Sequence, residues 1–114
     1  MQSAVEFMPK IRILNKLARN NIHENLALRG ATAITRSLSD QEYKQALFAK
    51  LQEEVAEFLQ DPIPEELADI QEVINALAPI IAGSREELEK VREEKFNFRG
   101  GYDKKIFLCE IHEK

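Results

Sequence analysis

The strongest constraint on the fold is a proline-containing break between two long segments that are each apolar on one helical face. The break is Asp61-Pro62-Ile63-Pro64. Proline ends a helix because it lacks an amide proton and restricts the backbone of the residue before it. The connection is short, so the two helices are expected to lie antiparallel as neighbours. The sequence therefore predicts a helical hairpin in the middle of the chain.

Start and stop signals give the expected bounds of this hairpin and of a helix after it. A serine followed three residues later by a glutamate can satisfy two free amide groups at a helix start. This capping box occurs at Ser39–Glu42 and again at Ser84–Glu87. Pro64 is acceptable in a first helical turn, and a glycine favours a helix end. The predicted helices cover about 40–60, 64–82 and 85–96.

The two ends of the chain are expected to be less regular. Residues 10–28 carry apolar side chains at roughly helical spacing, which predicts a first helix that ends at Gly30. Residues 31–38 are rich in Thr and Ile and favour an extended stretch, and residues 104–111 are expected to form a short strand or an ordered tail. The predicted class is mainly all-α: a small antiparallel helical bundle in one domain over residues 1–114, with room for one short strand pair.

Composition excludes several classes of function. The net charge of −4 argues against broad binding to nucleic acid, which needs a basic surface. No apolar run reaches the roughly 20 residues that span a membrane. Cys109 is the only cysteine, so neither an internal disulfide nor a Cys/His zinc site is expected. We therefore expect a cytoplasmic protein with no membrane or nucleic-acid partner.

Acidic side chains border the apolar face of the first hairpin helix. Its apolar stripe consists of Leu47, Leu51, Val55 and Phe58. At about 100° per residue, Glu54 lies about 60° from the centre of this stripe, and Glu57 lies at its edge, about 120° away. Lys50 lies between these two glutamates. Glu54 is therefore expected to face the neighbouring helix, and Glu57 to lie beside it.

The second hairpin helix repeats this arrangement. Its apolar stripe consists of Ile63, Leu67, Ile70, Ile74, Leu77 and Ile81. Glu66 lies inside the stripe, about 40° from Ile70, and Asp69 lies about 100° away on the same side. The remaining glutamates, Glu53 among them, point toward solvent, where charged side chains are ordinary.

Four carboxylates beside a shared apolar interface need a counter-charge. An ionised carboxylate is costly to bury unless it is paired or bound to a metal, and neighbouring carboxylates raise one another's pKa values. Mg²⁺, or Mn²⁺, prefers oxygen ligands and keeps water and phosphate in its shell. Periodicity therefore predicts Glu54, Glu66 and Asp69 as metal ligands, with Glu57 at the margin of the set. The competing interpretation is a non-catalytic helical interaction or regulatory module, in which Lys or Arg side chains pair with these carboxylates.

Several segments resemble the all-α NTP pyrophosphatases, the MazG-like superfamily. Glu53-Glu54-Val55-Ala56-Glu57 followed by Glu66-Leu67-Ala68-Asp69 is similar to its EExxE…ExxD signature. Residues 15–20 (NKLARN), 36–43 (RSLSDQEY) and 99–106 (RGGYDKKI) resemble the NKLVRD, R-x-L-x-D-x-E-Y and RGGFxxRI segments of a short subgroup like phosphoribosyl-ATP pyrophosphohydrolase. The chain departs from that subgroup at Asn20, His23 and Lys105, where Asp, Pro and Arg are usual.

The resemblance implies a helical bundle that forms a dimer or tetramer. It implies that Glu54, Glu57, Glu66 and Asp69 hold Mg²⁺ and that a nucleotide is cleaved between its α- and β-phosphates, giving a nucleoside monophosphate and pyrophosphate. The substrate would be a non-standard NTP that a house-cleaning enzyme removes, or a nucleotide like phosphoribosyl-ATP. Glu54 and Glu57 are the candidates to orient or deprotonate the attacking water. The candidate phosphate contacts are basic side chains: Lys16, Arg19, Lys50, Arg99, Lys104 and Lys105.

Overall fold

The computed structural model describes residues 10–114 and shows four α-helices in that range. They are α1 (Ile22–Ala27), α2 (Asp40–Gln60), α3 (Pro64–Ala82) and α4 (Arg85–Arg99). The predicted all-α class is confirmed for these residues. The strand pair is wrong: residues 31–38 and 104–111 are extended or irregular and form no strand.

The capping signals position α2 and α4 as the sequence predicts. At the start of α2, Ser39 Oγ accepts a hydrogen bond from the Glu42 amide at 3.2 Å. The Glu42 carboxylate accepts one from the Ser39 amide at 3.0 Å, which completes the capping box. At the start of α4, Ser84 Oγ accepts from the Glu87 amide at 3.0 Å. Helix α4 continues to Arg99, three residues beyond its predicted end.

The predicted helix over residues 10–28 is wrong for most of its length. Only Ile22–Ala27 is helical. Asn15 has a φ of 47°, a left-handed conformation that interrupts a helix. Leu17 packs against the core of the α2–α3 hairpin. Helical periodicity alone does not predict such a tertiary contact, and residues 10–21 reach the hairpin as an irregular segment, which we call the arm.

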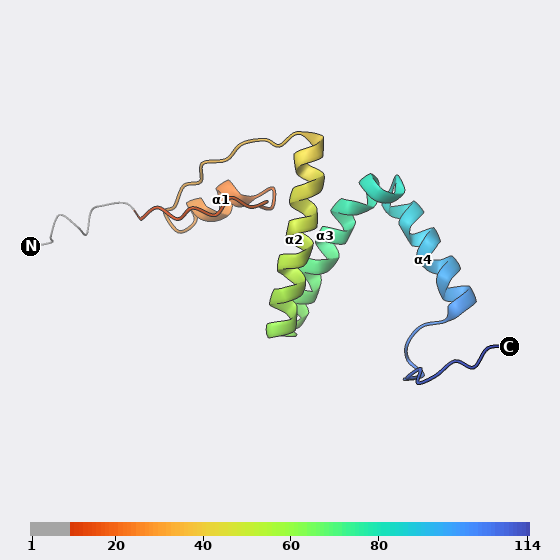
Figure 1. The fold of residues 1–114 in the computed structure, drawn as a ribbon. Helices are drawn as coiled ribbons and strands as arrows, with labels where there is room; N and C mark the ends of the chain where they lie inside the picture. The colour runs from red at the N-terminus through yellow and green to blue at the C-terminus, as the bar shows by residue number, and fades with distance from the viewer. Residues whose placement is uncertain (1–9) are drawn as a thin grey trace, which may run out of the picture.

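Helices α2 and α3 pack side by side and antiparallel (Figure 1), as the short Asp61–Ile63 connection requires. The core consists of Leu47, Val73, Leu77 and Ala78. Helix α4 packs only against α3 and diverges from the hairpin after Gly83 (Figure 1). The radius of gyration is 20.8 Å, whereas a compact chain of this length has one of about 13 Å. A closed bundle is therefore not formed within one chain.

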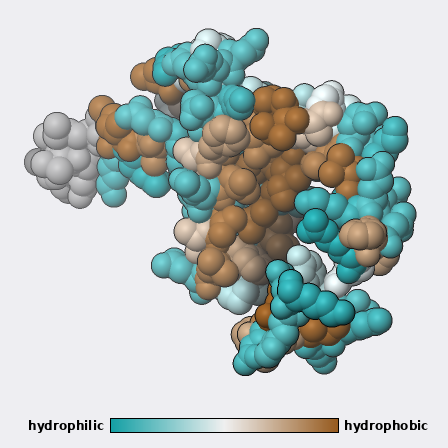
Figure 2. Space-filling view, turned by 45° about the vertical axis from the view of Figure 1, so that its right-hand side comes forward, coloured by the Kyte–Doolittle hydropathy of each residue, from teal (hydrophilic) through white to brown (hydrophobic). Residues whose placement is uncertain are grey.

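Much of the predicted apolar stripe faces away from the hairpin interface. Leu67 and Ile81 are 54% and 62% exposed, and Val55 and Ile74 are also exposed. The side of α3 that packs on α2 is centred on Val73, so the rest of its stripe lies outside the contact. Figure 2 shows hydrophobic residues gathered along the centre of the molecule. The hairpin thus leaves an apolar surface uncovered in the single chain.

No helix within residues 10–114 combines the length and apolar character needed to span a membrane. Cys109 is a free thiol in the exposed segment after α4.

Candidate metal centre

Three carboxylates from the two hairpin helices meet beside the closed end of the hairpin. Glu54 comes from α2, and Glu66 and Asp69 come from α3. One oxygen of each lies within 4.8 Å of one oxygen of the others. Ligands about 2.1 Å from a Mg²⁺ ion lie about 3–4 Å apart, so small side-chain movements suffice for these three carboxylates to share one ion.

Local sequence explains why these side chains converge. The Asp61 amide donates to the Glu57 carbonyl at 3.0 Å and the Ile63 amide donates to the Asp61 carbonyl at 2.8 Å, which turns the chain tightly between the helices. Pro64 then begins α3. Residues three apart lie on one face of a helix, so Glu66 and Asp69 both face the end of α2.

The Glu54 carboxylate is buried and only half satisfied. The residue is 6% exposed, and its Oε1 lies 3.3 Å from Lys50 Nζ. Its Oε2 is buried without a hydrogen-bond partner. Burial raises the pKa of Glu54, and the neighbouring Lys50 partly opposes that effect. A buried oxygen without a partner is costly, so this atom is a candidate ligand for a cation.

The negative charge of the Glu66 carboxylate has fewer positive neighbours than that of Glu54. Its Oε2 is also buried without a partner, and it forms no ion pair with any residue in the described range. Burial raises the pKa of Glu66, and the charges of Asp69 and Glu54 raise it further. The donor set is therefore all-oxygen, negatively charged and incompletely neutralised, which fits a hard divalent cation.

Glu57 is placed differently from the other three predicted ligands. It is exposed and lies outside the cluster that the structure brings together. Its charge contributes to the raised pKa of Glu54, one turn earlier on α2. Glu57 thus lies beside the cluster, as the helical periodicity of α2 predicts.

Two of the predicted phosphate contacts already pair with the cluster. Arg19 Nη2 lies 2.6 Å from Asp69 Oδ1, and Lys50 pairs with Glu54. Lys16 lies close by, on the same arm as Arg19. Arg99 is the last residue of α4 and Lys105 lies in the segment after it, and this part of the chain diverges from the hairpin (Figure 1).

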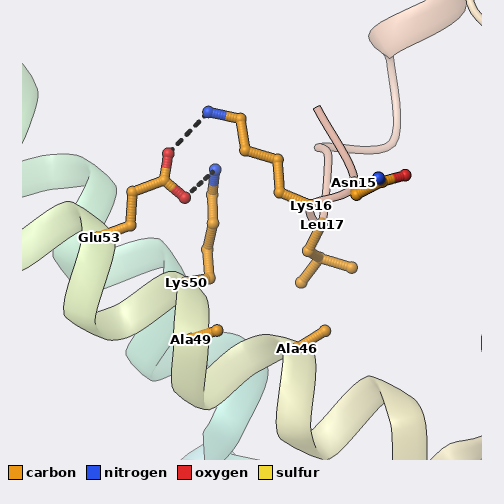
Figure 3. Close-up of a pocket in the computed structure, with 7 residues that line it drawn as sticks. All are labelled: Asn15, Lys16, Leu17, Ala46, Ala49, Lys50 and Glu53. Carbon is orange, nitrogen blue, oxygen red and sulfur yellow. Dashed lines mark hydrogen bonds and ion pairs between the residues drawn. The ribbon is translucent and has the colours of Figure 1, made fainter. Parts of the chain in front are cut away.

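Glu53 takes part in this network, although its helical position predicts a solvent-facing side chain. Its Oε1 lies 2.7 Å from Lys16 Nζ and its Oε2 lies 3.5 Å from Lys50 Nζ (Figure 3). The hydrogen bond from Lys16 and the charge of Lys50 lower the pKa of Glu53 despite partial burial. The spacing of Lys50 and Glu53 is a local signal for such a pair. The Lys16 contact is tertiary and has no such signal.

Two pockets in the described part of the chain differ in size and in distance from the cluster. One, of about 90 Å³, lies between the arm and α2 and is lined by Leu17, Lys50 and their neighbours (Figure 3). A larger one, of about 630 Å³, lies over the start of α2 and is lined by Asp40, Gln41, Tyr43, Lys44, Gln45 and Ile80. Ligand pockets usually measure about 300–1,000 Å³. The larger pocket lies about 14–21 Å along α2 from Glu54. Neither pocket is therefore both large enough for a nucleotide and next to the cluster.

Scans against protein-family models, curated proteins and solved structures found no significant match. Membership of the MazG-like superfamily therefore stays a prediction from the short motifs.

Proposed function

We propose that this chain is a nucleoside triphosphate pyrophosphohydrolase that depends on Mg²⁺ or Mn²⁺ and acts in the cytoplasm. It would cleave the bond between the α- and β-phosphates and release a nucleoside monophosphate and pyrophosphate. The observation that carries this proposal is the pair of buried, unpartnered oxygens, Glu54 Oε2 and Glu66 Oε2, inside the three-carboxylate cluster. The motif resemblance points to the same chemistry.

Each side chain has a role that follows from its position. Glu54, Glu66 and Asp69 would hold the cation, which stabilises charge on phosphate oxygens and lowers the pKa of a bound water. Glu57 is exposed one turn from Glu54 and would orient or deprotonate the attacking water. Lys50 and Arg19 pair with members of the cluster and would bind phosphate.

The proposed active form is a dimer or tetramer of this chain. Its accessible surface is 10946 Å², whereas a compact monomer of this mass exposes about 6,400 Å². The excess greatly exceeds the roughly 800 Å² per partner that a standard interface buries. A second copy on the apolar surface of Val55, Leu67, Ile74 and Ile81 would cover these exposed side chains.

A panel of nucleoside triphosphates assayed for pyrophosphate release with Mg²⁺ and Mn²⁺ tests the proposed reaction. Glu66→Gln is expected to abolish release, because it removes one charge of the cation site. Glu65→Gln is the matched control, since Glu65 is the exposed neighbour on the same helical turn. Full activity in the Glu66 variant would remove that residue from the mechanism.

The ion pairs favour one second candidate, a non-catalytic helical interaction module. Lys50 and Arg19 pair with two of the three carboxylates, Glu54 and Asp69, whereas that candidate also predicts a partner for Glu66. It predicts no response to metal. Isothermal titration with Mg²⁺ or Mn²⁺, together with the melting temperature, separates the two candidates: absence of both binding and thermal stabilisation would favour the interaction module.

A further inference from the structure

An irregular segment of the arm pairs with both hairpin helices beside the carboxylate cluster. We call residues 15–19 the strap. Lys16 Nζ lies 2.7 Å from Glu53 on α2, and Arg19 Nη2 lies 2.6 Å from Asp69 on α3. Figure 3 shows Lys16 reaching from the strap to Glu53. The strap therefore brings a positive charge to each helix, and one of these charges sits on a residue of the cluster.

The strap is fixed by a contact that does not depend on charge. Leu17, between the two basic residues, packs against the core formed by Leu47, Val73 and Leu77. The strap backbone can thus stay in place while the long side chains of Lys16 and Arg19 change partners.

We propose that Arg19 holds one member of the cluster, Asp69, in the absence of the divalent cation, and that the cation displaces it toward the polyphosphate of the ligand. This inference rests on the proposed metal site. A cation shared by Glu54, Glu66 and Asp69 would place two positive charges beside the guanidinium, which would then be repelled. The planar guanidinium pairs equally well with phosphate, because its paired donors fit both anions.

Two basic side chains, Arg19 and Lys50, pair with the cluster, and their exposure indicates which of them the divalent cation displaces. The Arg19 side chain is 63% exposed, whereas that of Lys50 is 18% exposed. Exposed ion pairs contribute little free energy, so the pair of Arg19 with Asp69 can be exchanged cheaply. Lys50 is held between Glu53 and Glu54 and would remain with α2. Binding of the metal would thus release Arg19 from Asp69, and the released guanidinium would bind the phosphate of the ligand.

The test is the effect of Arg19→Gln on two binding equilibria of the full chain. Mn²⁺ alone is expected to bind about two- to fivefold more tightly to this variant than to wild type, since it no longer competes with the guanidinium. Inorganic tripolyphosphate is expected to bind more weakly to the Mn²⁺-loaded variant. Tighter binding of Mn²⁺ together with weaker binding of tripolyphosphate indicates the exchange, because simple damage to the site would weaken the binding of both. Unchanged or weaker Mn²⁺ binding would overturn the inference.

Arg36→Gln is the matched control. Arg36 lies in the same N-terminal part of the chain and pairs with Glu42 at 3.2 Å, away from the cluster, so neither equilibrium should change. A direct readout is the NMR signal of the Arg19 side-chain Nε–H group in ¹⁵N-labelled protein, which should shift when Mg²⁺ is added. If wild type binds no Mn²⁺, the proposed function and this inference both fail. If wild type binds Mn²⁺ and the Arg19 signal does not shift, only this inference fails.

Discussion

Lys50 Nζ lies 3.3 Å from Glu54 Oε1 one turn along the same helix, and the second oxygen of that carboxylate has no partner. One ammonium group therefore satisfies half of a buried carboxylate. An i, i+4 pair of this kind is usually an exposed feature that stabilises a helix slightly. Here it lies at the junction of two helices, where the other oxygen is left without a positive or hydrogen-bonding partner.

Replacement of Glu66 by Gln should affect stability in opposite directions with and without metal. Without metal, the variant is expected to melt at a higher temperature than wild type, because it removes a carboxylate whose charge is unfavourable beside Asp69 and Glu54. With saturating Mg²⁺, the stabilisation that is expected for wild type should be largely lost in the variant. Thermal melts at pH 7.5 with and without Mg²⁺ measure both effects. A lower melting temperature without metal would contradict the expectation, and Glu65→Gln provides the baseline.

The raised pKa values of Glu54 and Glu66 predict a particular pH dependence of the metal-free protein. Both groups bind protons more tightly when folded than when unfolded. Their contribution to stability is therefore complete below the ordinary carboxyl pKa of about 4.3 and is lost as pH rises through their folded pKa values. The apparent affinity for Mg²⁺ should rise over the same range, because protons and metal compete.

The measurement is urea unfolding of wild type and Glu54→Gln/Glu66→Gln across pH 4–8. The pKa values of Glu42, Glu53 and Glu89 are lowered, so these groups make the free energy of unfolding rise with pH. They do so in both proteins, and their effect cancels when the variant is subtracted from wild type. The free energy of unfolding of wild type, relative to the variant, should fall as pH rises. A flat difference would show that the two carboxyls titrate normally.

A charge on the apolar surface should dissociate the proposed oligomer. Ile74 is 40% exposed on α3, and Ile74→Glu would place a carboxylate in the interface with a second copy. Sedimentation velocity is expected to show a shift from dimer or tetramer toward monomer. Gln71→Glu introduces the same charge on an exposed position of α3 and should leave the mass unchanged. A wild-type protein that sediments as a monomer would refute the proposed assembly directly.

Removal of the first capping box should destabilise α2. Ser39→Ala deletes the acceptor for the Glu42 amide, and such substitutions cost about 0.5–2 kcal/mol. Because α2 carries Glu54 and packs on α3, the loss should appear in the free energy of unfolding of the whole chain, measured with urea. Ser37→Ala, in the irregular segment before the helix, is the control and should have little effect. Equal values for the two variants would mean that the cap contributes nothing.

The sequence predicts those parts of the structure that local rules determine. The bounds of α2 and α3 follow from Ser39, Pro64 and Gly83, whose backbone preferences act within one helical turn. Glu54, Glu66 and Asp69 could be selected because helical periodicity and a short turn together fix which side chains face each other.

The features that the sequence does not predict depend on contacts between distant segments. Residues 10–21 have a helical apolar pattern, yet Leu17 contributes to a tertiary contact instead, and Lys16 reaches Glu53 across 37 positions of sequence. The exposed half of the α3 stripe has the same origin. Periodicity predicts that Leu67 and Ile81 pack against an apolar surface. It does not predict whether that surface belongs to α2 or to another chain.

The three-residue turn at Asp61–Ile63 also sets a limit on how this chain can change in length. Each residue added to a helix rotates the residues after it by about 100°, so an insertion that lengthened α2 or delayed the start of α3 would turn Glu66 away from Glu54. The irregular residues 31–38 carry no such constraint and would accept a tag or a loop graft without disturbing the carboxylates. The hairpin is therefore a unit of fixed length whose flanks are open to engineering.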